Sequence, residues 1–105
     1  MAKFLLAYHG GGMPETEEEQ AQVLAAWGEW YGKLGASVVD PGNPIGQTKT
    51  VGADGSVSAG GGANPVSGYT IIDVSDIDAA AEAAKSCPIV QSGGSIEVAE
   101  TFNVM

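Results

Sequence analysis

The stretch that decides the fold is WGEWYGKLGASVVDPGNPI, residues 27–45. Its first half continues a helix that contains two tryptophans, and Gly35 is suited to end that helix with a left-handed cap. A short apolar run follows at 36–39, and then Asp40-Pro-Gly-Asn-Pro, in which two prolines within four residues exclude a continuing strand. The pattern therefore predicts a helix, a tight turn, a strand and a bend in direct succession.

The residues before this stretch predict a strand and the start of the helix. Residues 3–8 are mostly apolar and are followed by three glycines, which is typical of a short buried strand. Thr16 and Glu19 have the spacing of a capping box, and glutamates at 17–19 suit the positive end of a helix dipole. The acidic run is thus explained by helix physics, with an acidic binding surface as the alternative.

The helix is expected to run to about residue 34 and to present one apolar stripe. Gly28 and Gly32 interrupt its interior, and each costs about 1 kcal/mol relative to alanine. Such small residues predict a closely packed neighbour, for which another subunit is one explanation. The stripe consists of side chains that recur every three or four positions: Val23, Trp27, Trp30, Tyr31 and Leu34.

After the central stretch, the chain first predicts a hairpin and a loop. A turn signal, Ala-Asp-Gly-Ser at 53–56, lies inside a candidate hairpin at 47–58. Residues 57–68 are rich in glycine and poor in bulky apolar side chains, which indicates a loop. This loop is either a mobile cover over a pocket or a flexible linker.

The last third of the chain predicts strand, helix and strand. Residues 69–74 are rich in β-branched side chains and form the clearest strand. Ser75 is expected to cap a helix over 77–86, with Asp78 at the box position and Pro88 closing it. Alternation of apolar and polar residues then predicts a half-buried strand over 95–102.

The order of elements predicts an α+β fold. The predicted order is strand, helix, strand, a short hairpin or loop, strand, helix and strand. This is the split β-α-β pattern of a ferredoxin-like sandwich. The length predicts a single domain over residues 1–105. Both helices would cover one face of an antiparallel sheet. A second copy would cover the other face, with burial contributing about 25 cal/mol per Å². A homodimer is therefore expected.

The charge balance excludes several classes of partner. The 105 residues include 13 acidic and 4 basic side chains, all of the latter lysine, for a net charge of −9. This negative charge repels the phosphates of nucleic acids and of anionic membranes. Without arginine, the chain also lacks the side chain that forms paired hydrogen bonds with guanine. Neither nucleic acid nor an anionic membrane is therefore expected as a partner. No apolar run approaches about 18 residues. Cys87 is the single cysteine, so no internal disulfide is possible and a cytoplasmic location is expected.

Two residues are candidates for catalysis. His9 is the single histidine and lies where the first strand ends at a glycine turn, a position from which it could serve as a general acid or base. Asp40 ends the second strand and could orient His9 or bind substrate. The alternatives are a histidine bonded to backbone or water and an aspartate that caps the Pro-Gly turn.

The aromatic residues are candidates for binding a small molecule. Trp27, Trp30 and Tyr31 could wall an aromatic pocket, and so could Tyr8 and Tyr69, although core or interface packing is the commoner role of such side chains. Cys87 has no nearby histidine in the sequence and is expected to be a structural thiol. No metal or other cofactor is predicted, because one histidine, one cysteine and scattered carboxylates do not form a ligand set and the glycine run lacks the features of a phosphate loop.

Four segments together carry a resemblance to a known family. They are KFLLAYHG at 3–10, the stretch at 27–45, SGYTIIDVSDIDAAAEAAKSCPI at 67–89, and GGSIEVAETF at 93–102. In this order they cover most of the chain, and the sequence resembles the YCII-related proteins, especially the DGPF-domain branch. The resemblance implies a ferredoxin-like fold that dimerises into an α/β barrel. Few members of this family have an assigned biochemical activity.

The chain also departs from that family. Residues 59–66, AGGGANPV, stand where many relatives carry an Asp-Gly-Pro-Phe turn, so no role of that turn is carried over. One branch resembles dehydrochlorinases with a proposed His and Asp pair, but the histidine there belongs to the first helix and this chain has none in that helix. Many relatives are encoded beside regulatory genes. Two functions therefore stay open. The first is a small-molecule site, enzymatic or not, near His9 and Asp40, at a cleft formed by the end of the first strand and the bend after the second. The other is a non-catalytic regulatory or interaction module.

Overall fold

The computed structural model describes residues 2–11 and 15–102 of the chain. Within these residues the protein is a mixed α+β structure with a four-stranded antiparallel sheet, three α-helices and a separate two-stranded hairpin. The elements in chain order are β1 (Ala2–His9), α1 (Glu17–Leu34), a 3-10 turn (Gly35–Ser37), β2 (Val38–Asp40), β3 (Lys49–Val51), β4 (Val57–Ala59), β5 (Val66–Val74), α2 (Ile77–Lys85), α3 (Pro88–Gln91) and β6 (Ser95–Glu100).

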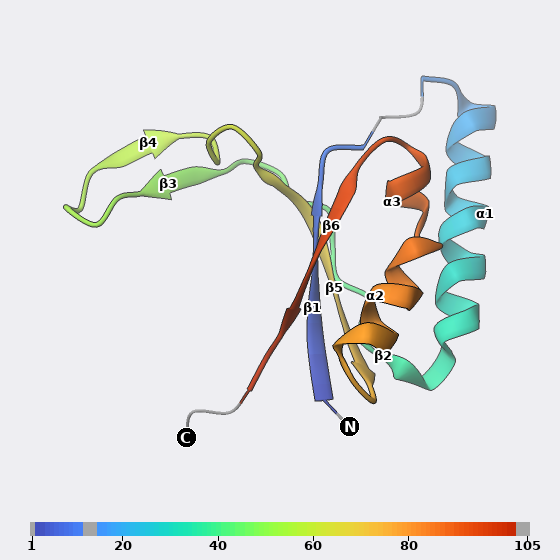
Figure 1. Ribbon diagram of the computed structural model, residues 1–105. Helices are drawn as coiled ribbons and strands as arrows, with labels where there is room; N and C mark the ends of the chain where they lie inside the picture. The colour runs from blue at the N-terminus through green and yellow to red at the C-terminus, as the bar shows by residue number, and fades with distance from the viewer. Residues whose placement is uncertain (1, 12–14, 103–105) are drawn as a thin grey trace.

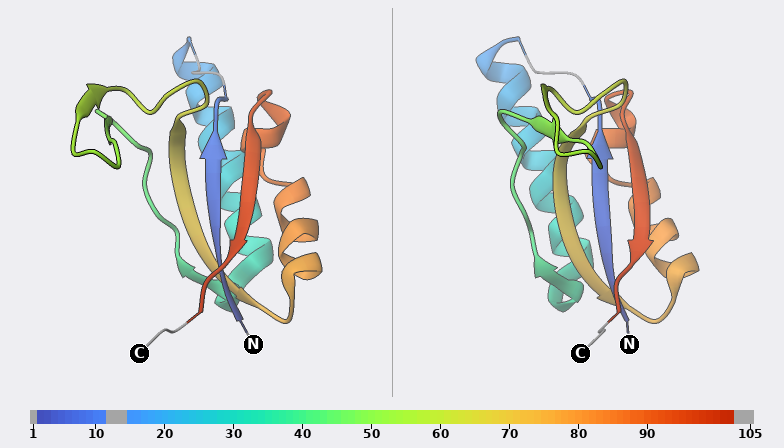
Figure 2. Two further views of the ribbon diagram at one scale, coloured as in Figure 1. Left: turned by 60° about the vertical axis from the view of Figure 1, so that its left-hand side comes forward. Right: turned by 90° about the vertical axis from the view of Figure 1, so that its left-hand side faces the viewer.

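The sheet has the strand order β2-β5-β1-β6, and all neighbouring strands are antiparallel. The helices lie together on one face of this sheet, as Figures 1 and 2 show. The opposite face carries no helix (Figure 2). The predicted α+β class with an antiparallel sheet covered on one face is confirmed.

Alternation along β1 places the core between the sheet and the helices. Phe4, Leu6 and Tyr8 are buried on the helix side, while the residues between them face the other way. From α1, Trp30 is 2% exposed and its indole nitrogen donates to the Ala83 carbonyl oxygen at 2.9 Å. Because this bond satisfies the polar atom of Trp30, the side chain can be buried as part of the core.

Helix α1 has the predicted ends. Thr16 is the N-cap and its hydroxyl accepts from the Glu19 amide at 3.0 Å, while Gly35 ends the helix with a φ of 54°. The expectation of close packing at Gly28 and Gly32 is wrong within the chain. A Cβ built at either position would meet nothing within 4 Å, because both glycines lie on the exposed side of the helix.

The structure corrects three further expectations. The second strand begins at Val38 because a 3-10 turn takes up residues 35–37. The cap of α2 is Asp76, whose Oδ1 accepts from the Ala79 amide at 2.8 Å, in place of Ser75. Pro88 does not simply end a helix; it opens the short helix α3, because proline suits the first helical position.

The predicted hairpin exists, and the expected loop at 57–68 is shorter than predicted. Residues 57–59 form β4 and β5 begins at Val66, so the loop itself covers residues 60–65. The β3–β4 hairpin projects away from the sheet and helices (Figure 1), and all of its strand residues are exposed.

None of the helices among the described residues combines the length and the apolar character needed to cross a bilayer.

Candidate functional site

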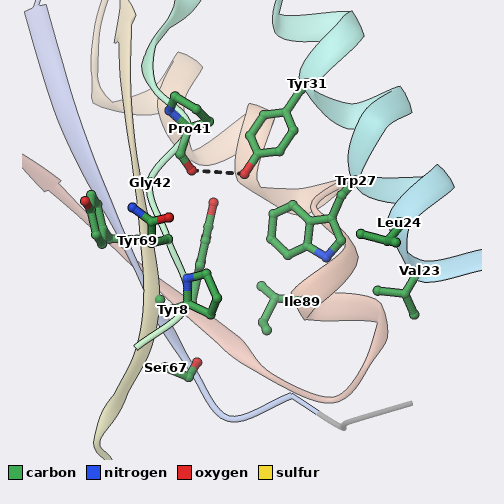
Figure 3. A pocket seen from close by; sticks show the side chains of 13 residues that line it. Tyr8, Val23, Leu24, Trp27, Tyr31, Pro41, Gly42, Ser67, Tyr69 and Ile89 are labelled. Carbon is green, nitrogen blue, oxygen red and sulfur yellow. Dashed lines mark hydrogen bonds between the residues drawn. The ribbon is translucent and has the colours of Figure 1, made fainter. Parts of the chain in front are cut away.

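A cavity of about 370 Å³ lies between α1 and the sheet, close to the end of β1 (Figure 3). Four parts of the chain enclose it: the face of α1 that looks at the sheet, the end of β1, the loop after β2, and the first residues of β5, with one side chain from α3. The lining residues are Tyr8, Val23, Leu24, Trp27, Tyr31, Pro41, Gly42, Asn43, Pro44, Ser67, Gly68, Tyr69 and Ile89.

One wall of the cavity is aromatic. The ring of Trp27 lies 5.5 Å from that of Tyr8 and 5.7 Å from that of Tyr31, measured between ring centroids. These distances are those of favourable aromatic pairs, which contribute about 0.5–1.5 kcal/mol beyond burial. The rings support one another and form a continuous apolar surface.

The opposite wall is the loop after β2, which lies directly against the edge of β5. Pro44 forms an isolated antiparallel bridge with Gly68, and the Ile45 amide donates to the Ser67 carbonyl oxygen at 2.9 Å. A Cβ at Gly42 would be 1.7 Å from the Tyr69 carbonyl oxygen, and this glycine has a φ of 75°. The close approach of loop and strand therefore requires glycine at this position.

A chain of hydroxyl groups fixes this loop to the core. The Pro41 carbonyl oxygen accepts from the Tyr31 hydroxyl at 3.0 Å, the bond drawn in Figure 3, and from Thr70 Oγ1 at 2.9 Å. Thr70 in turn accepts from the Tyr8 hydroxyl at 2.5 Å. Thr70 is fully buried, and burial also raises the pKa of Tyr8. All three hydroxyl hydrogens are therefore engaged within the protein.

The cavity is uncharged. Among the residues that the structure describes, no lysine, histidine, aspartate or glutamate contributes to its lining, and the chain contains no arginine. The nearby Cys87 is fully buried in the core, and that burial raises its pKa to about 11. The thiol is therefore protonated near neutral pH and does not act as a nucleophile there.

His9 faces the side of the sheet away from the cavity, since it follows Tyr8 in the strand and side chains alternate. Its Nδ1 lies 3.0 Å from the Asn64 carbonyl oxygen and 3.2 Å from that of Pro65. Carbonyl oxygens only accept, so Nδ1 carries a hydrogen. Nε2 lies 3.6 Å from a carboxylate oxygen of Glu97. His9 thus holds the base of the β3–β4 hairpin against β1.

Asp40 and His9 are not brought together within the chain. Asp40 pairs with Ile71 of β5, which on its other side pairs with Leu5 of β1. Leu5 precedes His9 by four residues, so the two candidates are separated by roughly 13 Å along the strand direction alone. Asp40 Oδ1 instead accepts from the Gly42 amide at 2.8 Å. Its observed role is the alternative one, capping the turn.

The predicted binding residues are divided as well. Tyr8 and Trp27 line the cavity, as expected, whereas Trp30 is packed in the core and borders a separate depression of about 130 Å³. The bend after the second strand borders the cavity as predicted, through residues 41–44, whereas Ile89 was not anticipated. The Pro-Gly-Asn-Pro sequence signals a turn, but its return onto β5 depends on tertiary contacts. Tyr31 and Tyr69, also predicted as possible wall residues, line the cavity too.

No group of three or more histidine, cysteine, aspartate or glutamate side chains within residues 2–11 and 15–102 could hold a metal ion. Comparison with known proteins adds no assignment: no family model matches the sequence, and no curated protein is significantly similar to it.

The hydroxyl chain predicts the effect of replacing Thr70. A Thr70→Val variant keeps the volume but leaves the Tyr8 hydroxyl without its acceptor and the Pro41 carbonyl with one donor fewer. We expect the free energy of unfolding to fall by about 1–3 kcal/mol, measured by urea denaturation. Thr101→Val is the matched control, since its hydroxyl bonds the Lys3 carbonyl on the exposed surface, and it should change stability by less than about 0.5 kcal/mol. Equal effects of the two variants would contradict this role of Thr70.

Proposed function

We propose that this protein binds a small, uncharged, mainly apolar and flat molecule in the cavity between α1 and the loop after β2. The observation that carries the proposal is the aromatic wall of Tyr8, Trp27 and Tyr31, which faces open space. A flat ring system is the shape that such a wall contacts best. The volume of about 370 Å³ falls within the range of small-molecule sites, which is about 300–1,000 Å³.

The charge distribution supports an uncharged ligand. An anionic ligand would lose its hydration in a lining without a described cationic side chain, and the net charge of −9 would repel it at longer range. Leu24 at the rim is 72% exposed, so the mouth of the cavity is apolar too. An exposed leucine beside an aromatic cavity gives an apolar molecule a continuous path into the site.

We propose binding, without a defined reaction, as the function of this cavity. The candidate acid–base residues His9 and Asp40 do not line it, and each is engaged in bonds that support the backbone. The hydroxyl groups of Tyr8 and Tyr31 are likewise engaged. His9 offers no accessible nitrogen for acid–base work within one chain, because Nδ1 bonds backbone carbonyl oxygens and Nε2 is buried without a hydrogen-bond partner among the described residues.

We also propose that the chain is a ferredoxin-like, YCII-related protein that forms a homodimer through its uncovered sheet face. The strand order β2-β5-β1-β6 supports the ferredoxin-like assignment, with the β3–β4 hairpin as an insertion. Leu5, Ala7 and Ile71 support the dimer, because they lie on the face without helices and remain partly exposed in one chain.

A non-catalytic interaction module is the second candidate function. The β3–β4 hairpin favours it: the arm projects from the body, and Val51 and Val57 on it are 68% and 61% exposed. These two valines are directly paired across the hairpin, so they form one small apolar surface.

The binding proposal predicts a preference for neutral aromatic molecules. Naphthalene should bind at least about tenfold more tightly than 1-naphthoate, because the carboxylate finds no described counter-charge in the cavity. A Leu24→Ala variant should bind naphthalene about threefold more weakly, since apolar surface at the rim is lost. The measurement is an NMR titration of ¹⁵N-labelled protein.

Val57→Ala is the control for that titration, because Val57 is similarly exposed but lies on the hairpin. Its affinity for naphthalene should equal that of the wild type. No saturable shift with naphthalene, or equal loss of affinity in both variants, would refute binding in this cavity and leave the interaction module as the better candidate.

The dimer predicts a solution mass of about twice the 10.6 kDa chain, measured by light scattering coupled to size exclusion. Ile71→Lys places a charge on the uncovered face and should give the monomer mass. Glu18→Lys, at an exposed position of α1, adds the same side chain elsewhere and should leave the dimer intact. A wild-type protein that stays monomeric at high concentration would exclude this dimer.

A further inference from the structure

The two tryptophans of α1 differ in one respect that bears on what the cavity can bind. The indole nitrogen of Trp30 donates to the Ala83 carbonyl oxygen at 2.9 Å. The indole nitrogen of Trp27 has no hydrogen-bond partner within residues 2–11 and 15–102, and it is not among the buried polar atoms left unpaired there. This N–H is therefore unpaired among the described residues and not completely buried, so it can donate to a ligand.

This donor belongs to the cavity. Trp27 lines it, and Figure 3 shows the nitrogen on the edge of the ring that faces Val23 and Ile89, which also line it. An indole N–H only donates, so its natural partner is an acceptor atom. A purely apolar ligand that covered this edge would remove water from the N–H without replacing the hydrogen bond, at a cost in affinity.

Other donors around the cavity are already used. The hydroxyl groups of Tyr8 and Tyr31 donate to Thr70 and to Pro41, and the Ser67 hydroxyl donates to the Gly10 carbonyl oxygen at 3.1 Å. The ring of Tyr69 lies on the far side of β5 from Trp27 in Figure 3. The Asn43 amide, an exposed group on the loop wall, is the remaining alternative to Trp27.

We infer that Trp27 is the specificity-determining donor of this site and that its ligand is a neutral, planar aromatic molecule with a hydrogen-bond acceptor on its edge. A ring nitrogen or a carbonyl oxygen meets this requirement. The inference rests on the proposed function, since it takes the cavity as the binding site. It adds the chemical class of the ligand: the aromatic wall contacts the faces of the molecule, and the Trp27 N–H selects a ring that carries an acceptor.

Quinoline and naphthalene are the probes that isolate the donor. They have the same shape, and quinoline carries a ring nitrogen as its acceptor; at mildly alkaline pH it is uncharged. Trp27→Phe keeps an aromatic wall but removes the N–H. We expect the ratio of the naphthalene Kd to the quinoline Kd to fall by about 3- to 10-fold in this variant, the usual worth of one hydrogen bond. Comparing ratios removes the different water solubilities of the two probes.

Asn43→Ala is the matched control and should keep the wild-type ratio. If the ratio of the naphthalene Kd to the quinoline Kd falls in Asn43→Ala but keeps its wild-type value in Trp27→Phe, the donor is Asn43 and the inference is overturned. An unchanged ratio in both variants, with both probes still binding, would overturn the inference while leaving the proposed binding function intact. Binding of neither probe would refute the binding function and the inference with it.

The wild-type protein gives a readout that does not depend on any variant. The two tryptophans give two indole N–H signals in a ¹⁵N–¹H spectrum, and Trp30 serves as the internal reference because its N–H is already bonded to Ala83. Saturation with quinoline should move the Trp27 indole proton downfield, and saturation with naphthalene should not. A quinoline shift confined to Trp30, or the same downfield shift with both probes, would contradict the proposed hydrogen bond.

Discussion

The carbonyl oxygen of Pro41 accepts two hydrogen bonds, from Tyr31 on α1 and from Thr70 on β5, and the site depends on this pair of contacts. They join a helix, a central strand and the loop after β2 at one atom. Because Thr70 also accepts from Tyr8, the loop is tied to the buried end of β1 as well. The polar atoms satisfy one another inside an apolar environment, where an unpaired group would be costly.

This arrangement leaves space between the loop and α1. The aromatic side chains are held on one side by contacts among themselves, and the loop is held on the other by backbone contacts with β5 at Gly68. The hydroxyl groups of Tyr8, Tyr31 and Ser67 have complete hydrogen bonds, and the Trp27 N–H and the Asn43 amide are the side-chain donors left for a ligand. A cavity of this kind is suited to selecting ligands by shape and by one directional bond, and its described lining offers no charge for acid–base work.

The sequence was sufficient to predict the fold class and the position of most elements, because helix caps, apolar periodicity and turn residues are local signals. The Thr16 cap and the Gly35 end of α1 are examples. It was also sufficient to name Tyr8, Trp27, Tyr31 and Tyr69 as candidate wall residues, and all four line the cavity. Local signals could not predict whether His9 and Asp40 lie close together. Their separation depends on the register of β5, which lies between β1 and β2 in the sheet. The same limit applies to Trp30, whose place in the core is decided by its bond to Ala83, 53 positions away in the chain.

The central claim is that the space between α1 and the loop after β2 is a ligand site. Intermolecular NOEs between naphthalene and methyl-labelled protein test it most directly. The account predicts contacts from naphthalene protons to the methyl groups of Val23, Leu24 and Ile89, which surround the cavity. Contacts confined to Val51 and Val57 on the hairpin, or to the methyl groups of Leu5 and Ile71 on the uncovered sheet face, would contradict it.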